Sequence, residues 1–243
     1  MEPPDAAQWQ EIEMRLLASR IVYLALGMVA GAQAAVAQTA PLQVVELFTS
    51  QGCSSCPPAN ASLAVLSTRP GILALSFGVT YWDSLGWKDT FAQPRFTDRQ
   101  WAYARGLKHS QVYTPQVVVN GRIDTVGQSP AAIEAAIRQA PLPAGPSLSL
   151  QAAAVSIAGA APANPADVWL VRYDPNTVQA PIRRGENGGK TLPHRNVVRE
   201  LTLLGQWRGG ARSFAIPPAP AGLNTAVLLQ AGAGGPILAA ARS

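Results

Sequence analysis

The sequence predicts an α/β domain followed by a small, sandwich-like all-β domain, and three observations lead to this prediction. An apolar stretch at 42–48 is typical of a buried strand, and it runs into the motif Cys53-Ser-Ser-Cys56 at the start of a helix-compatible segment. Another strand follows Thr114-Pro115 and ends at Asn120-Gly121, a dipeptide typical of two-residue hairpin loops. After the Pro- and Ala-rich segment 141–146, short apolar segments alternate with turn residues, and no helix is indicated.

The N-terminal 37 residues are predicted to be absent from the working protein. Residues 14–37 resemble a secretory signal peptide, with two arginines, an apolar core at 21–30 and a small-residue cleavage site at 35–37. The acidic residues 1–13 are interpreted as lying upstream of the true start. Because the apolar core is short for a bilayer, we expect no firm membrane span after cleavage, although an uncleaved anchor stays open. The predicted location is therefore the periplasm or the cell exterior.

Composition limits the number of domains and the classes of partner. The 243 residues are 48% apolar and 14% charged and carry a formal net charge of +5, so the chain can bury a sizeable core. Its arginines and lysines are scattered rather than clustered, so we predict no nucleic-acid partner. The length favours two small domains, which the patterns place at 38–142 and 143–243, after the upstream residues 1–37.

The other elements of the first domain follow from turn residues and local composition. Prolines directly after Cys56 are tolerated in a first helical turn, and Ser129-Pro130 has the pattern of an N-cap followed by the first helical residue. A long aromatic insertion at 78–110 either fills the core or lines the cysteine site. The predicted elements are a helix at 59–67, a strand at 72–77, a helix at 97–107, strands at 117–119 and 123–126, and a helix at 131–139. This order, βαβ then ββα with a helical insertion, is a thioredoxin-like layout.

The two cysteines are the leading candidates for chemistry. At the junction of strand and helix, the helix dipole and the unpaired N–H groups favour a thiolate. A low-pKa thiol in a Cys-x-x-Cys pair beside a βαβ pattern is the arrangement used for thiol–disulfide exchange. Cys53 and Cys56 are also compatible with an inert local disulfide or with a soft metal such as Cu(I). A zinc site is disfavoured because it normally needs four protein ligands.

Thr114-Pro115 would lie across from the cysteines in such a layout. Pro115 is a candidate cis proline, because cis peptide bonds are nearly confined to X-Pro in specified turns. An ordinary trans proline at a strand start is the alternative. The backbone of Thr114 is expected to pair with an extended substrate chain beside the sulfurs.

The second domain is predicted from short apolar segments. The predicted strands are 148–153, 168–173, 197–204, 213–216, 226–230 and 237–241. The polar segment 183–190 is interpreted as a long hairpin loop, because its glycines and basic residues match no phosphate-binding spacing. His109 and His194 are the histidines of the chain, and each is either structural or a third ligand to the cysteines; His109 lies nearer to the Thr-Pro strand.

Four motifs, VELFTSQGCSSCPPA, YWDSLGWKD, VYTPQVVVNGR and HRNVVREL, together resemble an uncharacterised bacterial family of exported thioredoxin-like proteins, known as a domain of unknown function. The resemblance covers nearly all of the chain after the signal segment. It implies a thioredoxin fold plus a C-terminal β-rich domain, and it implies no established substrate. This chain departs from the family pattern before YWD, where Gly78 and Thr80 stand in place of a His and an Asp. Any role of those two side chains as proton acceptor or metal ligand would be lost here.

We therefore expect an extracytoplasmic thiol–disulfide oxidoreductase, with Cys53 as the attacking thiolate and Cys56 as the resolving thiol. Its partners would be protein thiols or disulfides, and no cofactor is indicated, because no nucleotide-binding motif is present. The motif does not determine the direction of electron transfer, nor does the sequence predict an oligomeric state. Two alternatives remain: a Cu(I) carrier or chaperone that uses the same cysteines, with or without His109 as a third ligand, and a non-catalytic interaction module.

Overall fold

Two parallel strands lead into the cysteine motif and determine its position. In the computed structural model, which describes residues 41–243, β1 (Gln43–Thr49) pairs in parallel with β2 (Ile72–Gly78) and antiparallel with β3 (Gln116–Val119). β4 (Ile123–Thr125) pairs with β3 across a turn in which Asn120 and Gly121 have φ values of 52° and 63°. Positive φ at both central residues is what a type I′ turn requires, so the predicted hairpin is confirmed.

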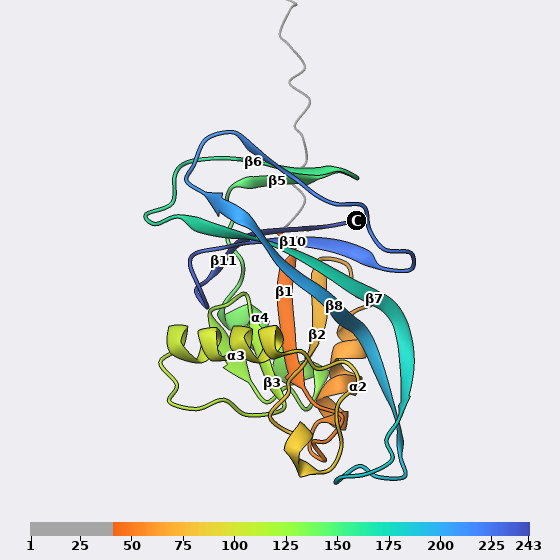
Figure 1. Ribbon diagram of the computed structural model, residues 1–243. Helices are drawn as coiled ribbons and strands as arrows, with labels where there is room; N and C mark the ends of the chain where they lie inside the picture. The colour runs from red at the N-terminus through yellow and green to blue at the C-terminus, as the bar shows by residue number, and fades with distance from the viewer. Residues whose placement is uncertain (1–40) are drawn as a thin grey trace, which may run out of the picture. The chain divides into compact units, whose positions relative to one another are not determined.

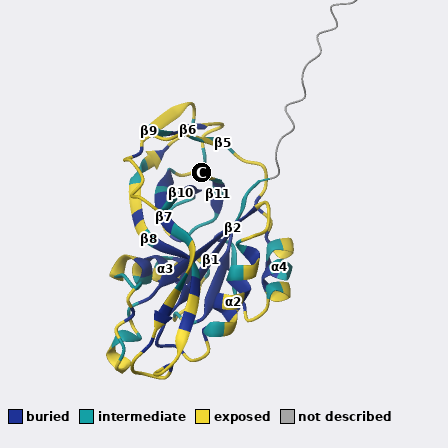
Figure 2. Ribbon diagram, turned by 90° about the vertical axis from the view of Figure 1, so that its right-hand side faces the viewer, coloured by how far each residue is buried: buried dark blue, intermediate teal, exposed yellow. Residues whose placement is uncertain are grey.

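Helices cover both faces of these strands (Figure 2). The helices are α2 (Pro57–Leu66), α3 (Pro94–Gly106) and α4 (Pro130–Gln139), with a short 3₁₀ turn, η1 (Asp83–Leu85), in the insertion. α2 and α4 pack on one face through residues such as Leu63 and Ile133. α3 packs on the other face, where Phe96 and Tyr103 join a core with Phe48 and Phe77. The strands are therefore buried on both sides, as their apolar sequences indicate.

A long hairpin connects the two ends of the structure. Its strands are β7 (Ala166–Pro181) and β8 (Thr191–Trp207). β10 (Asn224–Gln230) pairs with the first half of β7, and β11 (Ile237–Arg242) pairs with β10. The hairpin runs down past α2 toward η1, so that its closed end lies beside the start of α2 (Figure 1).

The predicted fold class is wrong, because one mixed sheet of eight strands runs through both halves of the chain. Its strand order is β11-β10-β7-β8-β2-β1-β3-β4, and β8 joins β2 in parallel at the pair Ser76 and Val197. The physical reason is the length of the hairpin: β8 reaches the free edge of β2, where Asn196 Nδ2 donates to the Ala74 carbonyl at 2.7 Å. The described residues are thus not a thioredoxin domain followed by a separate all-β sandwich.

A second, smaller sheet completes the structure. It has the order β5-β6-β9, with β5 at Ser147–Leu150, β6 at Ala154–Ala158 and β9 at Arg212–Ala215. Its apolar side chains, with Val155 and Ile157, pack against the β7–β10 part of the large sheet. Within residues 41–243, no helix has both the length and the hydropathy of a membrane span. The predicted signal segment lies outside the described residues.

Candidate functional site

The cysteine motif occupies the junction between β1 and α2, as predicted. β1 ends at Thr49, and Cys56 is the N-cap of α2, followed by prolines in the first turn. Cys53 and Cys56 form a disulfide with their Cα atoms 5.4 Å apart. Both cysteines are 0% exposed, whereas Ser54 and Ser55 between them are exposed. The Ser55 hydroxyl lies 3.3 Å from Cys53 Sγ, within hydrogen-bonding reach.

The insertion packs against the loop that precedes the cysteines. Asp89 Oδ2 accepts a hydrogen bond from Gln51 N at 2.7 Å, and Trp87 Nε1 donates to Gln51 Oε1 at 2.9 Å. Asp89 is 4% exposed, and burial raises the pKa of its carboxyl, against the lowering effect of the hydrogen bonds from Gln51 N and Phe91 N. The aromatic insertion therefore serves in part to hold the cysteine loop, beyond filling the core.

The Thr-Pro corner and the cysteine loop share one neighbour, Trp82. The Thr114–Pro115 peptide bond is cis, which confirms the expectation for Pro115. Trp82 Nε1 donates to Thr114 Oγ1 at 2.8 Å. A Cβ placed on Gly52 would lie 3.4 Å from Trp82 Cβ, so the same tryptophan packs beside the residue before Cys53. The structure thus links both predicted parts of the site through Trp82, a residue of the insertion for which the sequence left open a place in the core or beside the cysteines.

Exposed aromatic residues flank this corner. Tyr81 and Tyr113, next in sequence to Trp82 and Thr114, are each 37% exposed. Tyr113 Oη donates to Asp124 Oδ2 at 2.7 Å, and His109 Nε2 lies 2.9 Å from Asp124 Oδ1. Hydrogen bonds from Gln116, His109 and Tyr113 lower the pKa of Asp124 despite partial burial.

The tip of the β7–β8 hairpin, residues 182–190, is the part of the site that the sequence did not reveal. Asn187 Nδ2 donates to the backbone carbonyls of Gln51 and Cys53, at 3.0 and 2.9 Å. Glu186 Oε2 accepts from Ser54 N at 3.0 Å, and hydrogen bonds from Ser54 lower the pKa of the Glu186 carboxyl. The segment is the hairpin loop that we predicted, but nothing in its local composition signals a contact with residues more than 130 positions earlier.

Gly78 and Thr80 have structural explanations in this chain. A Cβ on Gly78 would come within 2.8 Å of Ala92 N and 2.9 Å of the Phe91 carbonyl carbon, so a side chain there requires the 91–92 backbone to shift. Thr80 Oγ1 lies 3.0 Å from Thr97 Oγ1 at the start of α3. The space that a larger side chain at 78 needs is therefore occupied by the insertion.

Neither histidine joins the cysteines. His109 pairs with Asp124, as described above, and His194 is buried on β8, with its ring edge-on to Phe91 at a centroid distance of 5.3 Å. Burial, together with the nearby Arg199, lowers the pKa of His194 to about 4. Among residues 41–243, no three side chains of the His, Cys, Asp and Glu types are grouped so as to hold a metal ion. The three-ligand copper arrangement with His109 is thus without structural support.

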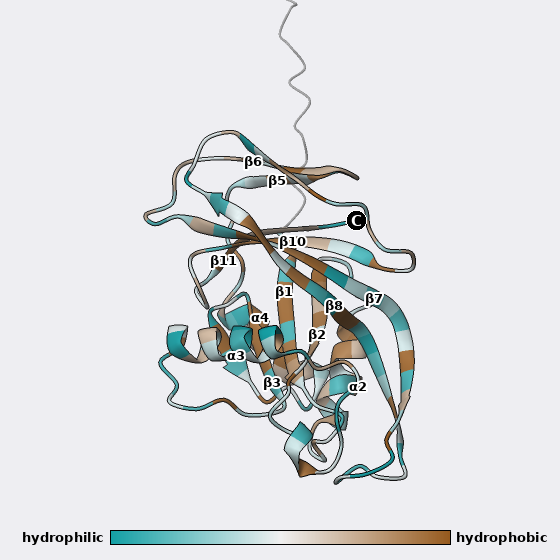
Figure 3. Ribbon diagram, in the orientation of Figure 1, coloured by the Kyte–Doolittle hydropathy of each residue, from teal (hydrophilic) through white to brown (hydrophobic). Residues whose placement is uncertain are grey.

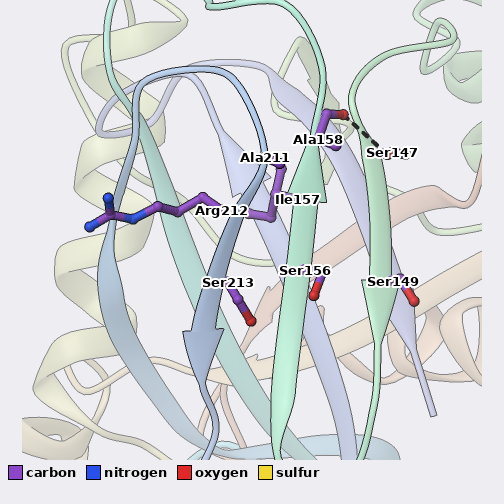
Figure 4. Close-up of a pocket in the computed structure, with 8 residues that line it drawn as sticks. All are labelled: Ser147, Ser149, Ser156, Ile157, Ala158, Ala211, Arg212 and Ser213. Carbon is purple, nitrogen blue, oxygen red and sulfur yellow. Dashed lines mark hydrogen bonds between the residues drawn. The ribbon is translucent and has the colours of Figure 1, made fainter.

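One surface cavity lies beside the cysteine loop, and another lies on the small sheet. One, of about 410 Å³, lies between the insertion and the hairpin and includes the cysteine loop at Gln51; its other lining residues are Trp87, Thr90, Phe91, Val178, Gln179, Ala180, Pro181 and Arg183. The other, of about 360 Å³, lies on the small sheet, where Ser149, Ser156 and Ser213 stand in register across three strands (Figure 4). The second cavity shares no residue with the cysteine loop.

Comparison with known proteins gives a family without an assigned function. No match was found among curated proteins. A crystal structure of protein AGR_C_4864 from Agrobacterium tumefaciens is 31% identical, covers 85% of this chain and 95% of its own, and superposes with a TM-score of 0.71. HBP35 of Porphyromonas gingivalis is 14% identical, with a TM-score of 0.56 over 84% of this chain and 75% of its own, and is similar in fold alone. The model of the family described as "Protein of unknown function (DUF1223)" matches residues 44–230, and the chain belongs to this family.

Proposed function

We propose that the protein is a thiol–disulfide oxidoreductase that works outside the cytoplasm. The observation that carries this proposal is the Cys53–Cys56 disulfide at the N-terminus of α2. A helix N-terminus stabilises a thiolate, and a cysteine pair in this position has the arrangement used for exchange. The extracytoplasmic location rests on the signal pattern at 14–37 and on the persistence of disulfides in oxidising compartments.

The exchange would proceed through a mixed disulfide. In one direction, the Cys53 thiolate attacks a substrate disulfide, one substrate sulfur leaves as a thiolate, and Cys56 then attacks Cys53 Sγ to release the second. The two electrons of the cysteine pair pass to the substrate, and the Cys53–Cys56 bond forms again. The reverse sequence, in which a substrate thiolate attacks Cys53 Sγ and expels Cys56, oxidises the substrate. The reduction potentials of the two couples decide which direction runs.

The substrate would be an extended polypeptide that carries cysteines. Thr114, held by Trp82, has the backbone that would pair with it, as strand addition does in peptide recognition. Tyr81 and Tyr113, which are both partly exposed at this corner, would contact its side chains. Protein thiols and disulfides are therefore the proposed partners.

Replacing Cys56 tests this function. In a Cys56→Ser variant the resolving thiol is absent, so disulfides between Cys53 and substrate proteins should accumulate in the producing cells. Such adducts are visible as reductant-sensitive bands on non-reducing gels. The Cys53→Ser, Cys56→Ser double variant is the control and should trap nothing. An absence of Cys53-dependent adducts in the single variant would contradict the proposed function.

A further inference from the structure

The disulfide as it stands in the structure is closed to attack. Exchange requires a third sulfur to approach along the S–S axis, but Cys53 and Cys56 are both 0% exposed. Some neighbouring segment must therefore move before either sulfur can react. The segments against the cysteine loop are the insertion, with Trp82 and Asp89, and the tip of the β7–β8 hairpin.

The hairpin tip holds the loop through its side chains. Asn187 is 0% exposed, and both of its amide hydrogens are used, one on the Gln51 carbonyl and one on the Cys53 carbonyl. Its Oδ1 accepts from Lys190 Nζ at 3.1 Å, within the tip. Glu186 Oε2 accepts a hydrogen bond from the backbone N–H of Ser54, the residue directly after Cys53. Three hydrogen bonds thus fix the backbone on both sides of Cys53 to one distant turn.

The arm that carries the tip extends beyond the sheet. β10 pairs with β7 only as far as Tyr173, and β8 meets β2 at Val197. Between these points and the tip, the two strands pair only with each other. A small apolar cluster with Ala180, Ile182 and Leu192 packs on Trp87 and Phe91, and the buried ring of His194 also lies against Phe91. One hydrogen bond, from Arg195 Nε to Ser67 Oγ at 2.8 Å, ties this part of the hairpin to the end of α2. Few buried apolar contacts hold this arm, which is the condition for local opening at low free-energy cost.

A break in strand pairing marks the base of the arm. The register of β7 and β8 shifts between Asp174 and Thr177, and on the opposite strand Asn196 has a φ of 52°. Asn196 is also the residue that bonds to Ala74 of β2, so the sheet side of this point is anchored. The tip itself is internally bonded, with Ile182 N on Lys190 O and Gly189 N on Ile182 O, both at 2.8 Å. A turn of the arm as a unit would therefore have its hinge at this base.

We propose that the hairpin tip 182–190 is a movable cover of the Cys53–Cys56 disulfide and that Asn187 is the positioning residue that holds it closed. In the closed form, Asn187 and Glu186 fix the cysteine backbone, and the sulfurs are buried. When these bonds break, the arm turns away and Cys53 becomes open to a reacting sulfur. That this gating serves catalysis rests on the function proposed above; the gating itself concerns access to the disulfide alone.

The rate of disulfide reduction by a small neutral reductant measures this gating. Tris(hydroxypropyl)phosphine is suitable, because it carries no charge that a substituted residue would attract or repel. Asn187→Leu keeps the approximate size of the side chain and removes both donors, so the full chain should be reduced about tenfold faster than the unsubstituted protein, the change expected for the loss of hydrogen bonds of ordinary strength. Glu186→Gln, at an exposed position, should give a smaller increase.

Arg184→Gln is the matched control. Arg184 lies in the same tip and is exposed, so its substitution should leave the rate unchanged. The rates of the unsubstituted protein and the variants should also depend weakly on urea below the unfolding transition, because a local opening exposes little surface.

Three results would overturn the proposal. The first is that the disulfides of Asn187→Leu and Glu186→Gln, or of whichever of these two variants folds, are reduced at the same rate as in the unsubstituted protein. The second is equal acceleration by Arg184→Gln. The third is reduction that rises steeply with urea, because access then requires global unfolding. The phosphine needs no protein substrate, so these results are independent of the mixed-disulfide trapping experiment. The trapping experiment can contradict the proposed function while the reduction rates support the movable cover, and the opposite outcome is equally possible.

Discussion

The two prolines after Cys56 determine which groups remain to stabilise a thiolate in the motif. Pro57 and Pro58 have no amide hydrogen, and the next two amides, of Ala59 and Asn60, both donate to the Cys56 carbonyl, at 3.0 and 3.1 Å. Ser54 N is held by Glu186. The start of α2 therefore offers a Cys53 thiolate fewer free amide hydrogens than a helix N-terminus normally does, although the helix dipole remains. The Ser55 hydroxyl, 3.3 Å from Cys53 Sγ, is therefore a local hydrogen-bond donor that can stabilise the thiolate.

Removing that hydroxyl should make the Cys53 thiol less acidic. In the reduced protein, a hydrogen bond to a thiolate lowers its pKa, so Ser55→Ala should raise the pKa of Cys53 by about 0.5–1 unit, the equivalent of one ordinary hydrogen bond. Ultraviolet absorbance of the thiolate as a function of pH measures the change. Ser54→Ala is the control, because the Ser54 hydroxyl donates a hydrogen bond to the Glu186 carboxylate rather than to Cys53 Sγ. No difference between the two variants would contradict the assignment.

At the level of elements, the sequence predicts where helices and strands occur better than it predicts how long they are. β1, β2, the β3–β4 hairpin and α4 lie within a few residues of their predicted positions, because apolar runs, Asn-Gly and Ser-Pro are strong local signals. β7 and β8 were predicted only where they are apolar. Their outer halves contain Pro175, Pro181 and Pro193, which argue against a strand in a central position. These prolines are tolerated because neither β10 nor β2 pairs with this part of the hairpin (Figure 3).

A buried ion pair connects several elements and illustrates what local patterns omit. Arg99 on α3 binds both carboxylate oxygens of Glu46 on β1, at 2.7 and 3.1 Å, and its third nitrogen donates to Gln230 on β10 at 3.1 Å. Tyr103 Oη donates to the same carboxylate. Glu46, like Gln43, interrupts the apolar strand predicted at 42–48, and its neighbours in sequence indicate no partner for it. Every partner comes from a distant part of the chain.

Breaking this ion pair should lower the free energy of unfolding strongly. Arg99→Met leaves a buried carboxylate without its cation, which typically costs about 3–5 kcal/mol. Urea unfolding followed by fluorescence gives the value. The Glu46→Gln, Arg99→Met double variant should lose less than Arg99→Met alone, since no unpaired charge remains. A loss below about 1 kcal/mol in the single variant would show that the pair contributes little.

At the scale of the whole molecule, two halves that look like separate domains in sequence share a sheet and a core. Phe48 and Phe77 of the first half pack in one cluster with Val171 and Leu228 of the second. The joining contact is a parallel pairing of segments about 120 residues apart, and no local pattern encodes it. The same is true of the site: the cysteines and Thr114-Pro115 were predictable from motifs, but the hairpin tip reaches the cysteine loop only because β7 and β8 are long.

The reduction potential of the Cys53–Cys56 pair tests the central claim most directly. The purified protein would be equilibrated with glutathione buffers, and the fraction of free thiols measured at each ratio. We predict reversible equilibration between about −270 and −120 mV, the range of known thiol–disulfide oxidoreductases. A pair that never equilibrates, or whose potential lies below about −300 mV as for structural disulfides, would contradict the oxidoreductase function.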